Sequence, residues 1–133
     1  MKKALLSLSF LVMAVCGMNA QKQLVSGPSI SVNEETHDYG NIEYDSPGTY
    51  EFIVTNTGTE PLIISNCSGS CGCTVPTCDT NPIMPGDKSP IKVKYDTKRS
   101  GPFTKTVTVN SNATNEPSKI LTIKGTVGAN PNG

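Results

Sequence analysis

Apolar and polar side chains alternate with a period of two over several short stretches of this chain, chiefly residues 49–56, 91–95 and 103–110. A period of two places successive side chains on opposite faces of an extended strand, whereas a helix needs an apolar residue every three or four positions. Each stretch is therefore predicted to be a strand with one buried face. The predicted inward side chains are Tyr50, Phe52 and Val54, then Ile91, Val93 and Tyr95, then Phe103, Val107 and Val109.

The composition after residue 20 also favours strands. It includes 15 Thr, 9 Ile and 8 Val but only 2 Ala and 3 Leu, so strand formers far outnumber the best helix formers. Residues 56–59, Asn-Thr-Gly-Thr, are predicted to form a hairpin turn between residues 49–56 and a strand at 61–65, because Asn and Gly accept positive φ. With further strands at 29–32 and 119–127, the chain is predicted to be all-β, an immunoglobulin-like Greek-key β-sandwich of about seven strands.

The first twenty residues have the layout of a secretory signal peptide. Lys2 and Lys3 precede a mainly apolar run, residues 4–16, which is short for a membrane span. Cleavage is predicted after Ala20, which would place the product in the periplasm or outside the cell. A lipid anchor on Cys16 is the alternative, although the bulky Val15 stands where a lipoprotein signal has a small residue.

The predicted mature chain consists of a linker (residues 21–28), one β-domain (29–128) and a tail (129–133). Of the 11 basic residues, two lie in the predicted signal, which leaves 9 basic against 11 acidic residues. Such a balance gives no electrostatic basis for binding nucleic acid. No stretch after residue 20 is apolar enough to predict a transmembrane segment. The expected partner is a protein or another cell-envelope component.

Residues 66–90 lack a regular alternation and hold all four cysteines of the predicted mature chain: Cys67, Cys71, Cys73 and Cys78. We predict a long Cys-rich loop stapled by two disulfides, because exported proteins fold in oxidising compartments. Three pairings are possible. A bridge between Cys71 and Cys73 is the least comfortable, because residues two apart on an extended chain lie near the upper limit of disulfide Cα separation.

Two other uses of these cysteines stay open. Four thiolates could bind zinc or copper(I), although gaps of three, one and four residues differ from the paired spacing of zinc ribbons. Cys71 and Cys73 could instead form a redox pair. The leading interpretation is structural disulfides, with no metal and no cofactor.

No other group of residues suggests catalysis. His37 is the only histidine, and it is expected to form a local hydrogen bond at a strand end. Asp38, Asp87 and Asp96 stand beside turn or strand-end residues, where capping a turn is the expected role. Neither a Gly-x-Ser-x-Gly motif nor a His-rich spacing is present. The sequence therefore predicts a protein that is not an enzyme.

Several short motifs together resemble one protein family. They are His37-Asp38-Tyr39-Gly40, residues 52–58 (FIVTNTG), Cys71-Gly72-Cys73-Thr74, residues 83–86 (IMPG) and Gly125-Thr126-Val127. In this order they resemble the DUF1573 family of exported bacterial proteins, common in Bacteroidetes and similar to ASPM/SPD-2/Hydin domains. The resemblance covers about residues 30–127. It implies an immunoglobulin-like fold and an exported location but no reaction, and Cys67 and Cys78 are additional to the family's usual cysteine pair.

The predicted function is a non-enzymatic binding or scaffold module of the bacterial cell envelope. Its predicted contact surface is the Cys-rich loop, including Ser68, Gly72, Thr74 and Pro76. An open sheet edge could also accept a partner strand by β-augmentation. The alternative is a periplasmic thiol-redox or metal-handling protein in which the four cysteines are the working groups.

Overall fold

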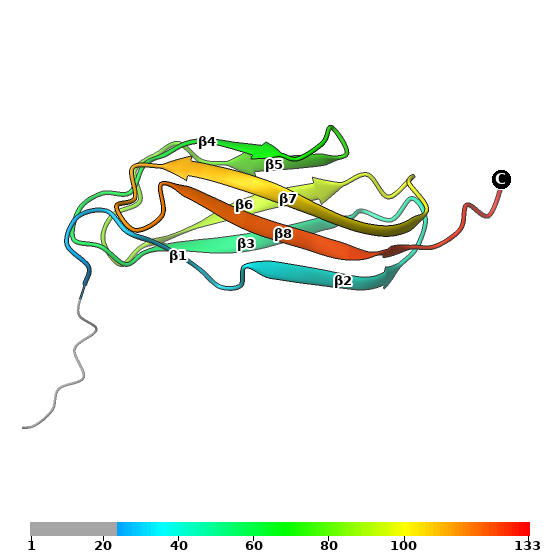
Figure 1. The fold of residues 1–133 in the computed structure, drawn as a ribbon, viewed down its shortest axis with the longest axis horizontal. Coiled ribbons are helices and arrows are strands. Elements are labelled where there is room, and N and C mark those ends of the chain that lie inside the picture. Colours follow the sequence, from blue (N-terminus) through cyan, green and yellow to red (C-terminus); the bar gives the residue numbers. More distant parts are fainter. Residues whose placement is uncertain (1–23) are drawn as a thin grey trace, which may run out of the picture.

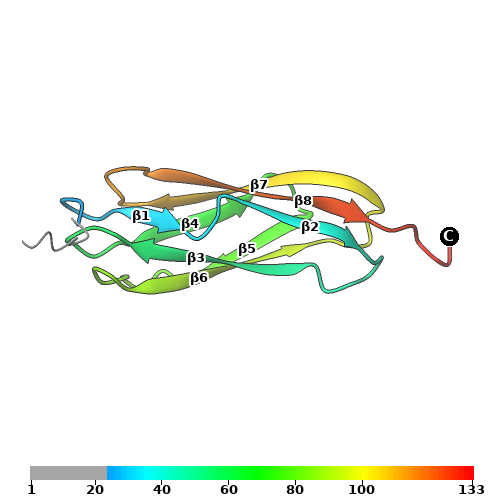
Figure 2. The same cartoon turned by 90° about the horizontal axis from the view of Figure 1, so that it is seen from below.

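The computed structural model describes residues 24–133, so the predicted signal peptide, the Cys16 anchor and the first linker residues lie outside the described part. Eight strands form two four-stranded sheets packed face to face, which Figure 2 views edge-on. The chain is therefore an all-β, immunoglobulin-like sandwich, as predicted. Its strands are β1 (Ile30–Val32), β2 (Thr36–Ile42), β3 (Thr49–Asn56), β4 (Ile64–Gly69), β5 (Thr74–Cys78), β6 (Lys88–Tyr95), β7 (Gly101–Ser111) and β8 (Ser118–Val127).

The first sheet has the strand order β1-β3-β6-β5, and the second has the order β2-β8-β7-β4. Neighbouring strands are antiparallel except β2 and β8, which run parallel. The chain passes between the sheets at both lateral sides, from β1 to β2 on one side and from β4 to β5 on the other (Figure 1). These crossings therefore join the edge strands of the two sheets: β1 and β5 are the edges of the first sheet, and β2 and β4 are the edges of the second.

The predicted inward side chains form the core, with one exception. Phe52, Val54 and the alternate residues of β6 and β7 are buried between the sheets. Tyr50 is only partly buried and packs against the edge of this core. The reason is its position, because β1 pairs only with the last three residues of β3 and leaves the β3 edge beside Tyr50 without a strand partner.

The predicted hairpin after β3 is wrong. β4 begins at Ile64 and lies beside β7 in the second sheet, so β3 and β4 are not paired. Neither Asn56 nor Gly58 has a positive φ. Glycine is needed at position 58 for a different reason, because a Cβ there would lie only 1.9 Å from the carbonyl oxygen of Gly27. The motif serves close backbone packing between two segments, and it does not form a tight reversal.

The side chain of Asn56 stabilises the end of the sandwich at which β3 finishes. Its side chain is fully buried. Its Oδ1 accepts a hydrogen bond from the backbone N–H of Gly58 at 2.9 Å, and its Nδ2 donates to the carbonyls of Glu60 at 2.7 Å and Ile83 at 2.8 Å. One amide therefore joins the β3–β4 connection to the β5–β6 connection. Backbone hydrogen bonds between Leu62 and Ile83, which form an isolated bridge, join the same two connections.

The predicted linker is ordered from Val25 onward. Val25 donates its N–H to the carbonyl of Thr57 at 3.1 Å, and Thr59 donates to the carbonyl of Gly27 at 2.9 Å. Pro28 is buried. These residues pack against the β3–β4 connection, so the expectation of a free polar tether is wrong for residues 25–28.

The predicted Cys-rich loop contains more regular structure than expected. Most of β4, all of β5 and the start of β6 lie within residues 66–90, and only residues 70–73 and 79–87 connect strands. Pro76 within β5 and the polar residues of β4 hide the alternation that marks the other strands. The cysteines consequently lie on two strands and the short turn between them.

We predict that Asn56→Ala lowers the free energy of unfolding by about 3 kcal/mol, because it leaves several buried polar groups without partners. Urea unfolding of residues 21–133 measures the change. Asn41→Ala is the control, since Asn41 is exposed and its replacement should change stability by no more than about 0.5 kcal/mol. Equal effects of the two substitutions would contradict the role of Asn56.

Candidate functional site: the Cys-rich edge

One lateral side of the sandwich consists of β4, β5 and the turn between them, residues 64–78, which we call the Cys-rich edge (Figure 1). A disulfide joins Cys67 of β4 to Cys78 of β5, with their Cα atoms 6.4 Å apart. Because β4 belongs to the second sheet and β5 to the first, this bond ties the edges of the two sheets together. The edge strands cannot separate without breaking it.

A second disulfide joins Cys71 to Cys73 within the turn, with a Cα separation of 5.2 Å. The sequence left the pairing open, and the structure contains the pairing that looked least comfortable. An extended chain was the wrong reference, because residues 71–73 bend through a turn. Both Cα separations lie within the usual range for disulfides, about 4.4–6.8 Å.

The four predicted contact residues do not form one surface. Ser68 and Gly72 are exposed and Pro76 is half-buried. Thr74 is only 2% exposed and faces the core, so its prediction as a contact residue is wrong. Its neighbour Val75 is 55% exposed instead. The period of two within β5 decides which residues face outward, and the sequence alone did not show where that strand begins.

The outer face around Val75 combines an apolar side chain with positive charge. Lys94 is the cross-strand partner of Val75 and Lys92 that of Thr77. Directly paired residues project their side chains on the same face of a sheet. Both lysines are exposed. This face can therefore pack against an apolar group and attract negative charge beside it.

The backbone of β5 is a poor template for a partner strand. Asp96 donates its N–H to the carbonyl of Cys73 at 2.8 Å, so by strand alternation Val75 also points its backbone groups toward β6. The backbone groups of the alternate residues Thr74 and Pro76 point away from β6. Thr74 already donates its N–H to the carbonyl of Cys71 at 3.2 Å, and Pro76 has no N–H. Addition of a strand at this edge is consequently disfavoured, and contact through side chains is favoured.

The remaining candidate chemistry is engaged locally. Within residues 24–133, no group of three metal-ligating side chains is placed to hold an ion. Asp38 and Asp96 accept backbone N–H groups from Gly40 and Lys98 at 2.8 and 3.1 Å, which confirms their capping role. Asp87 contributes its backbone instead, accepting the N–H of Asn56 at 3.0 Å.

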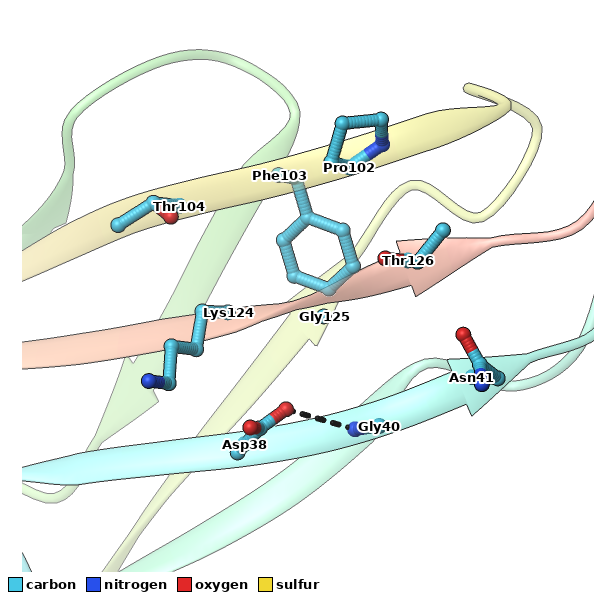
Figure 3. A pocket seen from close by; sticks show the side chains of 9 residues that line it. All are labelled: Asp38, Gly40, Asn41, Pro102, Phe103, Thr104, Lys124, Gly125 and Thr126. Carbon is cyan, nitrogen blue, oxygen red and sulfur yellow. Dashed lines mark hydrogen bonds between the residues drawn. The ribbon is translucent and has the colours of Figure 1, made fainter.

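A shallow pocket of about 340 Å³ lies toward the opposite edge of the second sheet, lined by residues of β2, β8 and the start of β7 (Figure 3). Gly125 leaves room there for the ring of Phe103, whose atoms would lie 3.1 Å from a Cβ at position 125. Lys124 and Asp38 line the pocket in register with each other. The Asp38 carboxylate accepts the Gly40 N–H at 2.8 Å, so one of these two charged groups also caps the backbone of β2.

His37 seals the side of the sandwich beyond the end of β1. Its Nδ1 lies 2.8 Å from Glu34 Oε1, which confirms the predicted local hydrogen bond. Its ring stacks on Tyr50, with centroids 3.5 Å apart, and meets the edge of Tyr39 at 4.9 Å. The imidazole therefore fills the gap beside β3 that the short β1 leaves open.

The comparisons with known proteins agree with this architecture. The model of the DUF1573 family, described as a protein of unknown function, matches residues 30–127. No curated protein is significantly similar to the chain.

In the part of the chain that the structure describes, no helix could cross a membrane.

Three solved structures share the fold. A protein of unknown function from Porphyromonas gingivalis W83 has a TM-score of 0.66 and 14% identity over 83% of this chain and 51% of that one. PapD-like domain 7 of human CEP192 has a TM-score of 0.62 and 9% identity over 86% and 93%. The VesB protease of Vibrio cholerae has a TM-score of 0.53 and 14% identity over 76% and 32%.

This chain spans about half the length of the P. gingivalis protein and about a third of the protease. At these identities the similarity shows the fold alone, a PapD-like sandwich. The same fold also occurs within a longer chain that is a protease.

We predict that Cys67→Ala with Cys78→Ala lowers the free energy of unfolding by about 2–3 kcal/mol, the chain-entropy value for a loop of this length. Urea unfolding without reductant measures the change. With reductant the variant and the wild type should be equally stable, since the bond is then absent from both. A difference of the same size under both conditions would show that the cysteines act through packing alone.

Burial, and to a smaller extent the neighbouring Tyr50, raises the pKa of Tyr39 to about 12. The unfolded chain loses this proton near pH 10, so between pH 10 and 12 the unfolded state binds fewer protons than the folded state. Stability should therefore fall as the pH rises through this interval. Thermal melting should show a steeper fall for the wild type than for Tyr39→Phe, and equal slopes would contradict the burial of the phenol.

Proposed function

The chain belongs to the DUF1573 family, and from this premise we propose that it is an exported, non-enzymatic binding module of the bacterial cell envelope. It contacts a protein or another envelope component through Val75 on β5 and the adjoining outer face of β6. The observation that supports this most strongly is the exposed Val75, held on a strand that a disulfide fixes at Cys78.

Rigidity makes this surface suitable for binding. A bound partner restricts the motion of the groups it contacts, and that loss of freedom weakens binding. Here the Cys67–Cys78 bond already restricts β5, and valine has a single side-chain torsion that branching at Cβ restricts further. Binding to Val75 therefore costs little conformational entropy.

The charges beside Val75 indicate the chemistry of the partner. Lys92 and Lys94 flank the apolar side chain on the outer face, and Glu51 is the cross-strand partner of Lys92. The partner surface consequently has an apolar group surrounded by carboxylates or similar anions. Both an acidic protein and an acidic envelope polymer have that character.

Export and the local pairing of the candidate acid–base groups complete the proposal. Two disulfides are typical of proteins that fold outside the cytoplasm, and the predicted signal peptide supports the same location. The groups that could have served acid–base chemistry have local partners, since His37 pairs with Glu34 and Asp38 with Gly40.

We predict that Val75→Thr combined with Lys94→Glu reduces capture of envelope components at least tenfold, about 1.4 kcal/mol of binding free energy. Immobilised mature chain is incubated with an envelope extract, and retained components are quantified against the wild type. Threonine keeps the branched shape of valine, so the strand itself is preserved.

The matched control is Ile120→Thr with Lys124→Glu. Ile120 is 47% exposed on β8 of the opposite sheet, so this pair makes the same kind of change on the other outer face. Capture by the control should equal that of the wild type. Equal losses from both pairs, or no loss from the first pair, would contradict the assigned surface.

A further inference from the structure

The turn of the Cys-rich edge leaves one residue of the Cys71–Cys73 disulfide partly exposed. Cys73 is 2% exposed and belongs to the core, whereas Cys71 is only partly buried. Gly72 between them is exposed, and no atom lies within 4 Å of a Cβ placed on it. The outer side of the turn is open at Gly72, and of the two cysteines only Cys71 is partly exposed to a thiolate from another molecule.

Two hydrogen-bond donors face these sulfurs. The backbone N–H of Cys73 donates to Cys71 Sγ at 3.3 Å. The hydroxyl of Thr74 lies 3.8 Å from Cys71 Sγ and 3.6 Å from Cys73 Sγ. Disulfide sulfurs carry no hydrogen, so the hydroxyl is the donor in both contacts. Donors at these positions stabilise negative charge on whichever sulfur leaves when the bond is broken.

The burial of Thr74 strengthens this effect. Its side chain is 2% exposed, so water does not compete for the hydroxyl, and a hydrogen bond to a charged atom is stronger in such surroundings. The orientation that makes Thr74 unsuitable as a binding residue therefore aims its hydroxyl at both sulfurs.

We propose that Cys71–Cys73 is a thiol–disulfide exchange site that oxidises proteins or peptides carrying two reduced cysteines, an activity beyond the binding function above. A substrate thiolate attacks Cys71 Sγ, and the electron pair of the Cys71–Cys73 bond leaves with Cys73 Sγ. The second substrate thiolate then attacks the substrate sulfur of the mixed disulfide, and that electron pair leaves with Cys71 Sγ.

The step is balanced in electrons and protons. Two electrons pass from the substrate dithiol, which becomes a disulfide, to the Cys71–Cys73 bond, which becomes two thiolates. These take up the two protons that the substrate thiols release. The Thr74 hydroxyl stabilises Cys73 Sγ as it leaves in the first half of the exchange. In the second half, the Thr74 hydroxyl and the Cys73 N–H both stabilise the leaving Cys71 Sγ. The Cys67–Cys78 disulfide, which joins two strands, takes no part.

The test mixes the oxidised mature chain with a short synthetic peptide that contains two reduced cysteines. Samples are quenched with acid and alkylated, and mass spectrometry with fragmentation of the intact chain locates each new thiol. The expected result is peptide oxidation matched by label on Cys71 and Cys73 at least tenfold faster than on Cys67 and Cys78. Exchange that is equally fast at both disulfides, or slower at Cys71–Cys73, would overturn the proposal.

Two variants test the role of the hydroxyl. Thr74→Val keeps the shape of the side chain and should slow exchange about tenfold, because it removes a hydrogen bond to a charged sulfur. Thr74→Ser keeps the hydroxyl and should retain the wild-type rate. Equal rates for the two variants would remove Thr74 from the mechanism.

A third variant separates this activity from the proposed binding function. Cys71→Ala with Cys73→Ala should slow peptide oxidation at least tenfold and leave the capture of envelope components unchanged. Val75→Thr with Lys94→Glu should show the reverse. Loss of both properties in either variant would show that the exchange site and the binding surface are not independent.

Discussion

The burial of alternate side chains between two facing sheets is the constraint on which the rest of this protein depends. Within residues 24–133, seventeen buried hydrophobic residues form the core, and apolar packing has no directional preference of its own. Polar and covalent contacts therefore determine how the margins of the sandwich close. Asn56 binds the connections at one end, the stack of His37 on Tyr50 closes one side, and the Cys67–Cys78 bond closes the other. Each contact lies where regular strand pairing stops.

The Cys-rich edge combines two properties because its residues alternate between outside and inside. Val75 projects from the strand that Cys78 anchors, and it provides an apolar contact next to lysine. Thr74 points the opposite way, toward the sulfurs of the turn. Because neighbouring side chains of β5 face opposite sides, the proposed binding face and the proposed exchange site are separate. Substitutions can therefore change one without the other.

Local alternation was sufficient to predict the fold class and most core-facing positions, because Phe52, Val93 and Val107 stand in regular strands whose pattern is visible within a few residues. It could not predict which strands pair. The motif at Asn56 suggested a hairpin, but close packing of Gly58 against a distant segment sends the next strand to the other sheet. The inward orientation of Thr74 was missed for a related reason, since β5 is an edge strand interrupted by proline and shows little hydrophobic pattern. The cysteine pairing depends on this same three-dimensional arrangement.

The central claim is that a disulfide clamps the two sheets along the edge that carries the candidate site. Mutation of Cys67 to Ser in the otherwise native mature chain tests it most directly, with alkylation under non-reducing conditions and fragmentation of the intact protein. The structure predicts a single label on Cys78, with the Cys71–Cys73 bond intact. A label on Cys71 or Cys73 would contradict this account, because β4 and β5 would then not be joined as described.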